Sequence, residues 1–191
     1  MLNDRDFYKD CELINGKKYF VKSSSPIHNA IMGNVVFNIG RYVDENKMGY
    51  VFTQGAGVRL SENNLLMPDV KVVKKENADI INWHGNIEGA PDMVVEIISR
   101  SSKNRDLNIK KDTYEANGVK EYWIIDPYFK SVMVYLLRDG KYFLDNEYIY
   151  FEDKEEFEEM PEEEKSNYKS EITLSIFPEL TVKLEDIFEI W

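Results

Sequence analysis

The run Met93-Val94-Val95-Glu96-Ile97-Ile98 decides the fold, together with a second run, Glu121-Tyr122-Trp123-Ile124-Ile125-Asp126. Both runs have the length and the β-branched or aromatic content typical of buried strands. A helical segment lies between them, with Ser101 or Ser102 as its N-cap and Asn117-Gly118 as its C-terminal stop. Because two strands joined by one helix normally lie parallel in one sheet, this unit predicts the centre of an α/β arrangement.

Further elements extend outward from this unit. Residues 10–22 place Asn15-Gly16 between two β-prone runs, which predicts a hairpin. Ser25-Pro26 then starts a helix whose apolar residues recur every four positions until Gly49. A second hairpin, joined across Asp139-Gly140, adds antiparallel strands at 131–137 and 141–144, so the sheet should be mixed. The fold class is therefore α/β (α+β), with a mixed sheet flanked by helices. The other expected elements are strands at 50–53, 57–60, 67–73 and 171–176 and a terminal helix at 184–191, whereas 76–89 follows no clear pattern.

Length and composition predict one domain spanning 1–191, because 191 residues with 43% hydrophobic content can bury one substantial core. No stretch approaches the roughly 20 apolar residues that cross a bilayer, and the first residues lack the apolar core of a secretory signal. We therefore expect a cytoplasmic protein with no membrane association. The one cysteine, Cys11, excludes an internal disulfide and a multi-cysteine zinc site, and we expect it to be a buried structural thiol.

The formal net charge of −11 is unevenly distributed. An acidic insert lies at about 152–169. Its residues 152–164 include nine acidic residues and one lysine, so the rest of the chain carries a net charge of only −3. The segment 100–111 is basic, and we identify Arg100, Lys103 and Arg105 as candidates for binding nucleic acid. A solvated helix face is the alternative interpretation. The insert could be a mobile linker, or it could imitate nucleic acid and occupy the basic segment.

Glu96 lies inside an otherwise apolar strand. Because burial of an unpaired carboxylate is costly, such a group normally becomes protonated, forms an ion pair or binds a metal. Asp69 occupies another strand-like run, and two carboxylates on adjacent strand edges suit a divalent cation. Asp92 shares the Glu96 face by strand alternation and is a candidate for a further metal ligand. The alternative is a pair of acids held in salt bridges at strand ends.

Helical phase selects the third member of the site. At about 100° per residue, Asp106 and Lys110 share one stripe with apolar residues on both sides, whereas Lys111 falls on the face expected to contact water. Asp69 and Glu96 would then hold Mg²⁺ (or Mn²⁺), and Lys110 would orient or deprotonate a water and stabilise developing charge. The ancillary candidates are Glu12, His28, Asp106 and Tyr114, although a histidine at a helix start is often purely structural.

Several of these residues also belong to a familiar pattern. It comprises Pro68-Asp69-Val70, the run from Ala90 to Ser99, Asp106, Lys110, Tyr114, Gly118-Val119 and the run from Glu121 to Pro127. This pattern closely resembles the Uma-two family of putative restriction endonucleases, within the PD-(D/E)XK nuclease superfamily. The likeness extends over most of the chain, including Glu12, His28 and Phe177-Pro178, but only its middle block is specific.

The resemblance implies a restriction-endonuclease-like core and Mg²⁺-dependent cleavage of DNA. In the usual superfamily pattern a lysine follows the acid by two residues, but that position is Ile98 here. The lysine of this family is found on the following helix, where Lys110, four residues before Tyr114, fits. A rival interpretation pairs Asp69 with Lys71 as an acid-x-Lys motif on one strand.

The expected function is a metal-dependent DNA endonuclease. We expect a homodimer, because a two-fold pair of sites readily cuts both strands of a duplex. A nuclease-fold protein that binds DNA or regulates without cleaving is the alternative, and the acidic total charge gives it some support. A third possibility is that RNA or a small phosphodiester is the substrate.

Overall fold

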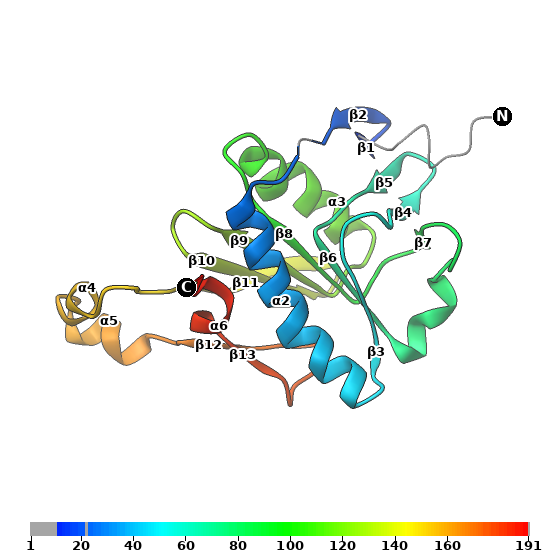
Figure 1. Cartoon of the computed structure of the whole chain (residues 1–191). Coiled ribbons are helices and arrows are strands. Elements are labelled where there is room, and N and C mark those ends of the chain that lie inside the picture. The colour runs from blue at the N-terminus through cyan, green and yellow to red at the C-terminus, as the bar shows by residue number, and fades with distance from the viewer. Residues whose placement is uncertain (1–10, 22, 191) are drawn as a thin grey trace.

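The central sheet of the protein is mixed, as the sequence predicted (Figure 1). The computed structural model describes residues 11–21 and 23–190. Within these residues the sheet has six strands in the order β11-β10-β9-β8-β6-β3. The strands are β3 (Gly49–Phe52), β6 (Val70–Lys74), β8 (Met93–Ile97), β9 (Glu121–Asp126), β10 (Ser131–Arg138) and β11 (Lys141–Ile149). Strands β8 and β9 are parallel, with Met93 beside Glu121, and the remaining pairs are antiparallel.

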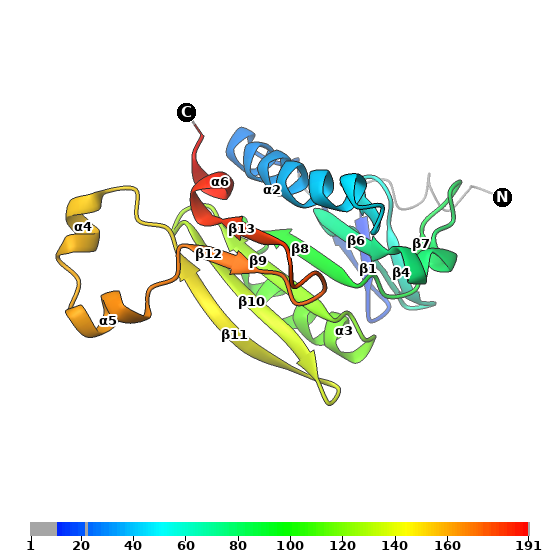
Figure 2. The ribbon, with the colours of Figure 1, turned by 90° about the horizontal axis from the view of Figure 1, so that it is seen from below.

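Helix α2 (Pro26–Glu45) covers one face of this sheet (Figure 2). The side chain of Ser25 caps it by accepting a hydrogen bond from the backbone of His28, as the Ser-Pro start predicted. Its buried stripe of Ile31, Val35, Ile39 and Val43 belongs to the main hydrophobic cluster. That cluster also contains Val95 and Trp123 of the sheet, so burial of this stripe fixes the helix over the centre of the sheet.

The opposite face carries the helix between β8 and β9. Its first part is a π-helical turn, η2 (Arg105–Lys110), and its second part is α3 (Lys111–Ala116). Tyr114 of α3 packs with Val94 of β8 and Tyr122 of β9 in a second hydrophobic cluster. Figure 2 shows α2 and α3 on opposite faces of β8 and β9. The π-helical turn was not predicted, because the helical phase assumed the α-helical value of about 100° per residue, and a departure over one turn is too short to recognise from apolar spacing.

A second sheet carries the N-terminal hairpin against the α3 face. Within the described part of the chain its order is β2-β1-β5-β4-β7. Asn15 and Gly16 both have positive φ, of 51° and 75°, which is the conformation expected for a two-residue hairpin. The strands are β1 (Cys11–Ile14), β2 (Lys17–Phe20), β4 (Val58–Ser61), β5 (Asn64–Leu66) and β7 (Ile87–Glu88). Cys11 is buried in β1, as expected.

Several sequence boundaries differ from the structure. The predicted strand at 171–176 stops after Thr173, and β12 (Glu171–Thr173) pairs with an unpredicted strand, β13 (Thr181–Lys183). The strand predicted at 67–73 begins only at β6, after the separate strand β5. The pattern-free segment contains η1 (Lys75–Ile80) before β7. The predicted terminal helix is α6 (Leu184–Phe188), and position 191 lies outside the described residues.

The acidic insert forms two short helices, α4 (Lys154–Glu158) and α5 (Glu162–Asn167), which project from the body of the protein (Figure 1). Lys165 contacts Glu158 and Glu162 within the insert, and Glu152 contacts Lys130. Among residues 11–21 and 23–190, no ion pair connects the insert to Arg100, Lys103 or Arg105. In the same residues, no helix is both long enough and apolar enough to span a bilayer.

Glu121, at the start of β9, fastens the C-terminal segment to the main sheet. One carboxylate oxygen accepts a 2.7 Å hydrogen bond from the indole of Trp123. The other oxygen accepts from the backbone and the hydroxyl of Ser175, at 2.8 and 2.6 Å, and from the backbone of Ile176 at 3.1 Å. Burial raises the pKa of Glu121, and these donors oppose that shift. The carboxyl group thus supplies acceptors to four donors at a buried junction.

We predict that Glu121→Ala destabilises the protein by about 3 kcal/mol or more, because each buried donor left without a partner costs about 1–3 kcal/mol. Chemical denaturation monitored by tryptophan fluorescence would measure the change in unfolding free energy. Glu171→Ala is the matched control, because Glu171 is an exposed glutamate in β12, and it should change stability by less than about 0.5 kcal/mol. Equal effects of the two substitutions would contradict the anchoring role.

Candidate active site

A cavity of about 530 Å³ lies where the C-terminal end of β8 meets the start of α2 and the π-helical turn η2. Four acidic side chains line it, and they come from β1, from the residue before β6, from β8 and from η2. Lys110 and His28 share the same cavity. The acidic residues are Glu12, Asp69, Glu96 and Asp106. The structure therefore brings the three predicted catalytic residues together with three of the four ancillary ones.

Lys110 is the centre of this group and is buried. Its ammonium lies 2.7 Å from a carboxylate oxygen of Glu12, 2.9 Å from Glu96 and 3.6 Å from Asp106. Burial opposes the charge on Lys110, but the three carboxylates outweigh burial and raise its pKa. Lys110 therefore remains an ammonium ion, able to donate hydrogen bonds and to stabilise negative charge. This favours orientation and charge stabilisation over the deprotonation that the sequence also allowed.

Glu96 lies in the interior, as strand alternation predicted. Its Oε1 accepts hydrogen bonds from Lys110 at 2.9 Å and from the phenol of Tyr114 at 2.7 Å. Burial raises the pKa of Glu96 well above its ordinary value, and the negative charges of Asp106 and Glu12 add to this effect while Lys110 opposes it. Burial also raises the pKa of Tyr114, which keeps the phenol neutral and available as a donor. The fourth ancillary residue, Tyr114, thus acts on the site through Glu96.

Asp69 lies beside Glu96, because the register that pairs Val70 with Val95 places the preceding residue opposite Glu96. Its Oδ2 accepts from the backbone of Ile97 at 2.8 Å and lies 3.1 Å from Nε2 of His28. Its Oδ1 accepts from the side-chain amide of Gln54 at 2.8 Å. Burial opposes ionisation of Asp69, but hydrogen bonding and charge from His28 outweigh it and lower the pKa. Asp69 is therefore held as a carboxylate.

The cluster around Lys110 contains more negative charge than positive charge. Glu12, Glu96 and Asp106 face one ammonium ion, and the guanidinium of Arg105 approaches Glu12 at 3.8 Å. Burial raises the pKa of Asp106 as well. Among the described residues, Oε2 of Glu12 and Oδ1 of Asp106 find no hydrogen-bond donor, although Arg105 and Lys110 lie 3.8 and 3.6 Å from them. A proton or a further cation would relieve this imbalance.

Asp92 does not lie in this cavity. Alternation puts it on the same strand face as Glu96, but at the opposite end of β8. Its carboxylate accepts from Lys120 at 2.6 Å, from Asn77 at 2.7 Å and from the backbone of Lys74 at 2.8 Å. Burial opposes its ionisation, yet these donors lower its pKa. The structure thus places Asp92 in a structural ion pair rather than with the other candidate metal ligands.

Lys71, the partner of Asp69 in the rival motif, is fully buried. Its ammonium donates to the backbone carbonyl groups of Pro68 and Thr53 rather than to the Asp69 carboxylate. Burial lowers its pKa to about 8, and the nearby charges of Glu96 and Asp69 act in the opposite direction. These contacts fix the backbone just before Asp69 and just before Gln54, which donates a hydrogen bond to Asp69.

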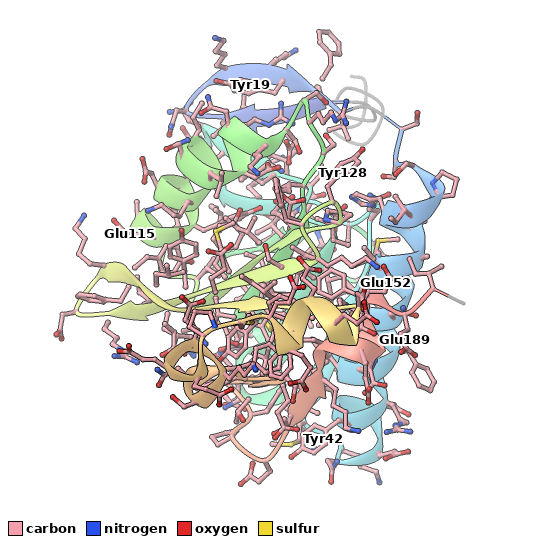
Figure 3. The ribbon with its side chains drawn as sticks, turned by 90° about the vertical axis from the view of Figure 1, so that its left-hand side faces the viewer. Tyr19, Tyr42, Glu115, Tyr128, Glu152 and Glu189 are labelled. Carbon is pink, nitrogen blue, oxygen red and sulfur yellow. The ribbon has the colours of Figure 1, made fainter. Side chains whose placement is uncertain are left out.

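The three basic residues expected to bind nucleic acid occupy two places. Arg105 lines the cavity and is partly buried between Glu12 and the ring of Tyr19. Arg100 and Lys103 lie outside the carboxylate cluster, over the rings of Tyr128 and Phe129. Tyr128 belongs to the rim of the same cavity, on the side that faces the viewer in Figure 3. Neither ring was identified from the sequence, although two aromatics in a turn after Asp126-Pro127 are a recognisable signal.

The fold is similar to that of a protein whose structure has been solved. A solved structure, described as a putative nuclease belonging to DUF820 from Anabaena variabilis ATCC 29413, is similar with a TM-score of 0.70 and 19% identity. The match covers 93% of this chain and 89% of the other, so the two proteins share a fold over nearly their whole length. No curated protein matches the chain.

The family follows from a family model. The model of Uma2, described as "Putative restriction endonuclease", matches residues 7–163. Since this range is most of the chain, the protein belongs to the Uma2 family. The resemblance inferred from the sequence motifs is thereby confirmed.

We predict that Lys110→Met destabilises the protein by about 3 kcal/mol or more, because it leaves buried carboxylates without their cation. Lys111→Met is the matched control, since Lys111 is the neighbouring lysine and contacts exposed Asp112. The control should cost less than about 1 kcal/mol. A double-mutant cycle with Glu96→Gln should show coupling between Lys110 and Glu96, and strict additivity would contradict the ion pair.

Proposed function

We propose that this chain is a divalent-metal-dependent endonuclease that hydrolyses phosphodiester bonds in DNA. One observation carries the proposal: a single cavity collects Asp69, Glu96 and Lys110 from three separate elements. Membership of the Uma2 family supports the nuclease assignment. The metal and the reaction are inferred from the chemistry of the side chains.

Asp69 and Glu96 are the residues that would hold Mg²⁺ or Mn²⁺. Within residues 11–21 and 23–190, no three His, Cys, Asp or Glu side chains form a ready-made metal cage. Mg²⁺ is nevertheless commonly held by one or two carboxylates, with waters and substrate phosphate completing its shell. The excess negative charge around Lys110 fits an additional cation, since Oε2 of Glu12 and Oδ1 of Asp106 accept no hydrogen bond from the described residues. When bound, such an ion acidifies a water and polarises the phosphate.

Lys110 has a role that its contacts support directly. As an ammonium ion beside Glu96, it can orient an attacking water and donate to a phosphate oxygen as charge develops there. Glu12 and Asp106 hold Lys110 in this position. Tyr114 fixes the carboxylate of Glu96 from the other side.

His28 is the remaining candidate for moving a proton. The hydrogen bond and charge of Asp69 raise its pKa, although burial acts in the opposite direction. The Nε2 atom of His28 lies 3.1 Å from Oδ2 of Asp69, so the ring is already engaged with that carboxylate. We assign His28 the role of orienting Asp69, with proton transfer as a secondary role.

DNA is the proposed partner, with three phosphate-binding residues: Arg105 in the cavity, and Arg100 and Lys103 in the smaller cavity beside it. A homodimer with two-fold symmetry would present two sites to the two strands of a duplex. A protein that binds DNA without cleaving it is the second candidate. It is favoured by the ion pairs that Lys110 already forms with Glu96 and Glu12, which partly satisfy the acids without a metal.

We predict Mg²⁺- or Mn²⁺-dependent nicking of supercoiled plasmid that stops when a chelator is added. Glu96→Gln, Asp69→Asn and Lys110→Met should each lower the cleavage rate about 100-fold or more, the usual cost of losing a metal ligand or a charge-stabilising donor. Gel electrophoresis of timed reactions would measure the rates, and circular dichroism would confirm that each variant is folded.

Asp92→Asn is the matched control. Asp92 is a buried carboxylate on the same strand face as Glu96, but it is paired with Lys120 outside the cavity. The folded variant should retain metal binding, measured by calorimetry, and cleavage within about threefold of the wild type. Cleavage that persists in Glu96→Gln would refute the assigned site. Metal-free DNA binding without any cleavage would favour the second candidate.

A further inference from the structure

The turn between β9 and β10 presents two aromatic rings to solvent. The side chains of Tyr128 and Phe129 are 62% and 71% exposed. The turn itself is held in place, because Oδ1 of Asp126 accepts hydrogen bonds from the backbone of both residues, at 2.9 and 3.2 Å. Single exposed apolar residues are common, but two consecutive rings on a fixed turn form a preorganised apolar surface.

Each ring has a basic side chain over it. The guanidinium of Arg100 lies 5.3 Å from the centre of the Tyr128 ring, and the ammonium of Lys103 lies 5.0 Å from that of Phe129. Lys103 also pairs with Asp126 at 3.0 Å, which offsets its charge. Among the described residues, no carboxylate lies within ion-pair distance of Arg100. The rings are therefore accompanied by at least one cation free to attract a phosphate.

This surface is continuous with the candidate active site. A second cavity of about 300 Å³ is lined by Arg100, Lys103, Tyr128 and Phe129. Tyr128, Ile98 and Ser99 line both this cavity and the larger one that contains Glu96. In Figure 3, Tyr128 lies between the N-terminal hairpin, which carries Tyr19, and the acidic insert, which begins at Glu152. A nucleic-acid strand bound at the carboxylates could thus place a neighbouring nucleotide at the rings.

We propose that Tyr128 and Phe129, with Arg100, form a stacking subsite for an unpaired base, so that the protein takes single-stranded DNA as its preferred substrate. An aromatic ring stacks on the face of a base, and that face is available only when the base is outside a duplex. The cations over the rings supply the charge that attracts the adjoining phosphate. This inference rests on the proposed nuclease function, because the subsite adjoins the candidate active site. Its claim, however, concerns the binding of single-stranded DNA and can be tested apart from cleavage.

The test measures binding apart from cleavage. Fluorescence anisotropy would follow a labelled 20-nucleotide single strand and the duplex of the same sequence, with Glu96→Gln as the background and chelator present. We expect the single strand to bind more tightly than the duplex. Adding Tyr128→Ala and Phe129→Ala together should weaken single-strand binding about tenfold or more, and duplex binding less than about threefold.

Matched variants separate stacking from charge and from general surface effects. Phe37 is 63% exposed on α2 with Arg41 over its ring at 5.5 Å, so Phe37→Ala removes a similar exposed pair elsewhere and should change nothing. Tyr128→Phe should retain most of the binding, because the ring remains. Arg100→Ala should reduce the dependence of affinity on salt, whereas Tyr128→Ala should not.

The outcomes distinguish this inference from the proposed function. Loss of single-strand binding in the aromatic variants supports the subsite, even if the wild type cuts no DNA. Normal cleavage and binding in those variants overturns the subsite and leaves the nuclease assignment intact. Absence of DNA binding by the wild type, or tighter binding of duplex than of single strand, also overturns it.

Discussion

The burial of one ammonium ion among several carboxylates is the interaction on which the rest of the site depends. Lys110 connects β1, β8 and the π-helical turn, because Glu12, Glu96 and Asp106 come from these three elements. The two hydrophobic clusters hold the main sheet together without it. What the ion pairs add is a fixed position for groups that would otherwise repel one another. Stability and chemistry are therefore coupled at Lys110, since either partner alone would be costly to bury.

The two faces of the central sheet differ in what covers them. The face under α2 is closed by a large apolar cluster that also takes in the C-terminal segment. The other face combines an apolar cluster around Tyr114 and Tyr122 with the charged group at one end of β8. The charged group of the cavity lies at the strand end, where the backbone of Ile97 and the side chain of Gln54 donate hydrogen bonds to Asp69. The apolar interior supplies rigidity to side chains that lie at its edge.

Sequence periodicity predicted the regular elements and the residues within them. Glu96 and Lys110 could be found because strand and helix geometry convert spacing into a face. Asp92 shows the limit of this reasoning. Strand alternation correctly places Asp92 on the same face as Glu96, but their separation of four residues spans roughly 13 Å, and alternation does not indicate which end of the strand holds the site. The contact of Gln54 with Asp69 could not be predicted, because Gln54 lies in a loop, where side chains follow no periodic pattern. Glu12 reaches Lys110 only through packing of the second sheet, so its ion pair was not predictable from local sequence.

The π-helical turn at Arg105–Lys110 has an evolutionary consequence. Such turns correspond to one residue inserted into an ordinary α-helix, and they persist mainly where a function compensates for their weaker backbone geometry. A single-residue insertion is a small genetic step, yet it rotates every later side chain around the helix axis. A helix that follows the strand can therefore present a lysine to the end of that strand without any change of fold. Removing one residue from the π-helical turn would restore regular α-helical hydrogen bonding and could increase the stability of the helix. It would also turn Lys110 away from its carboxylate partners.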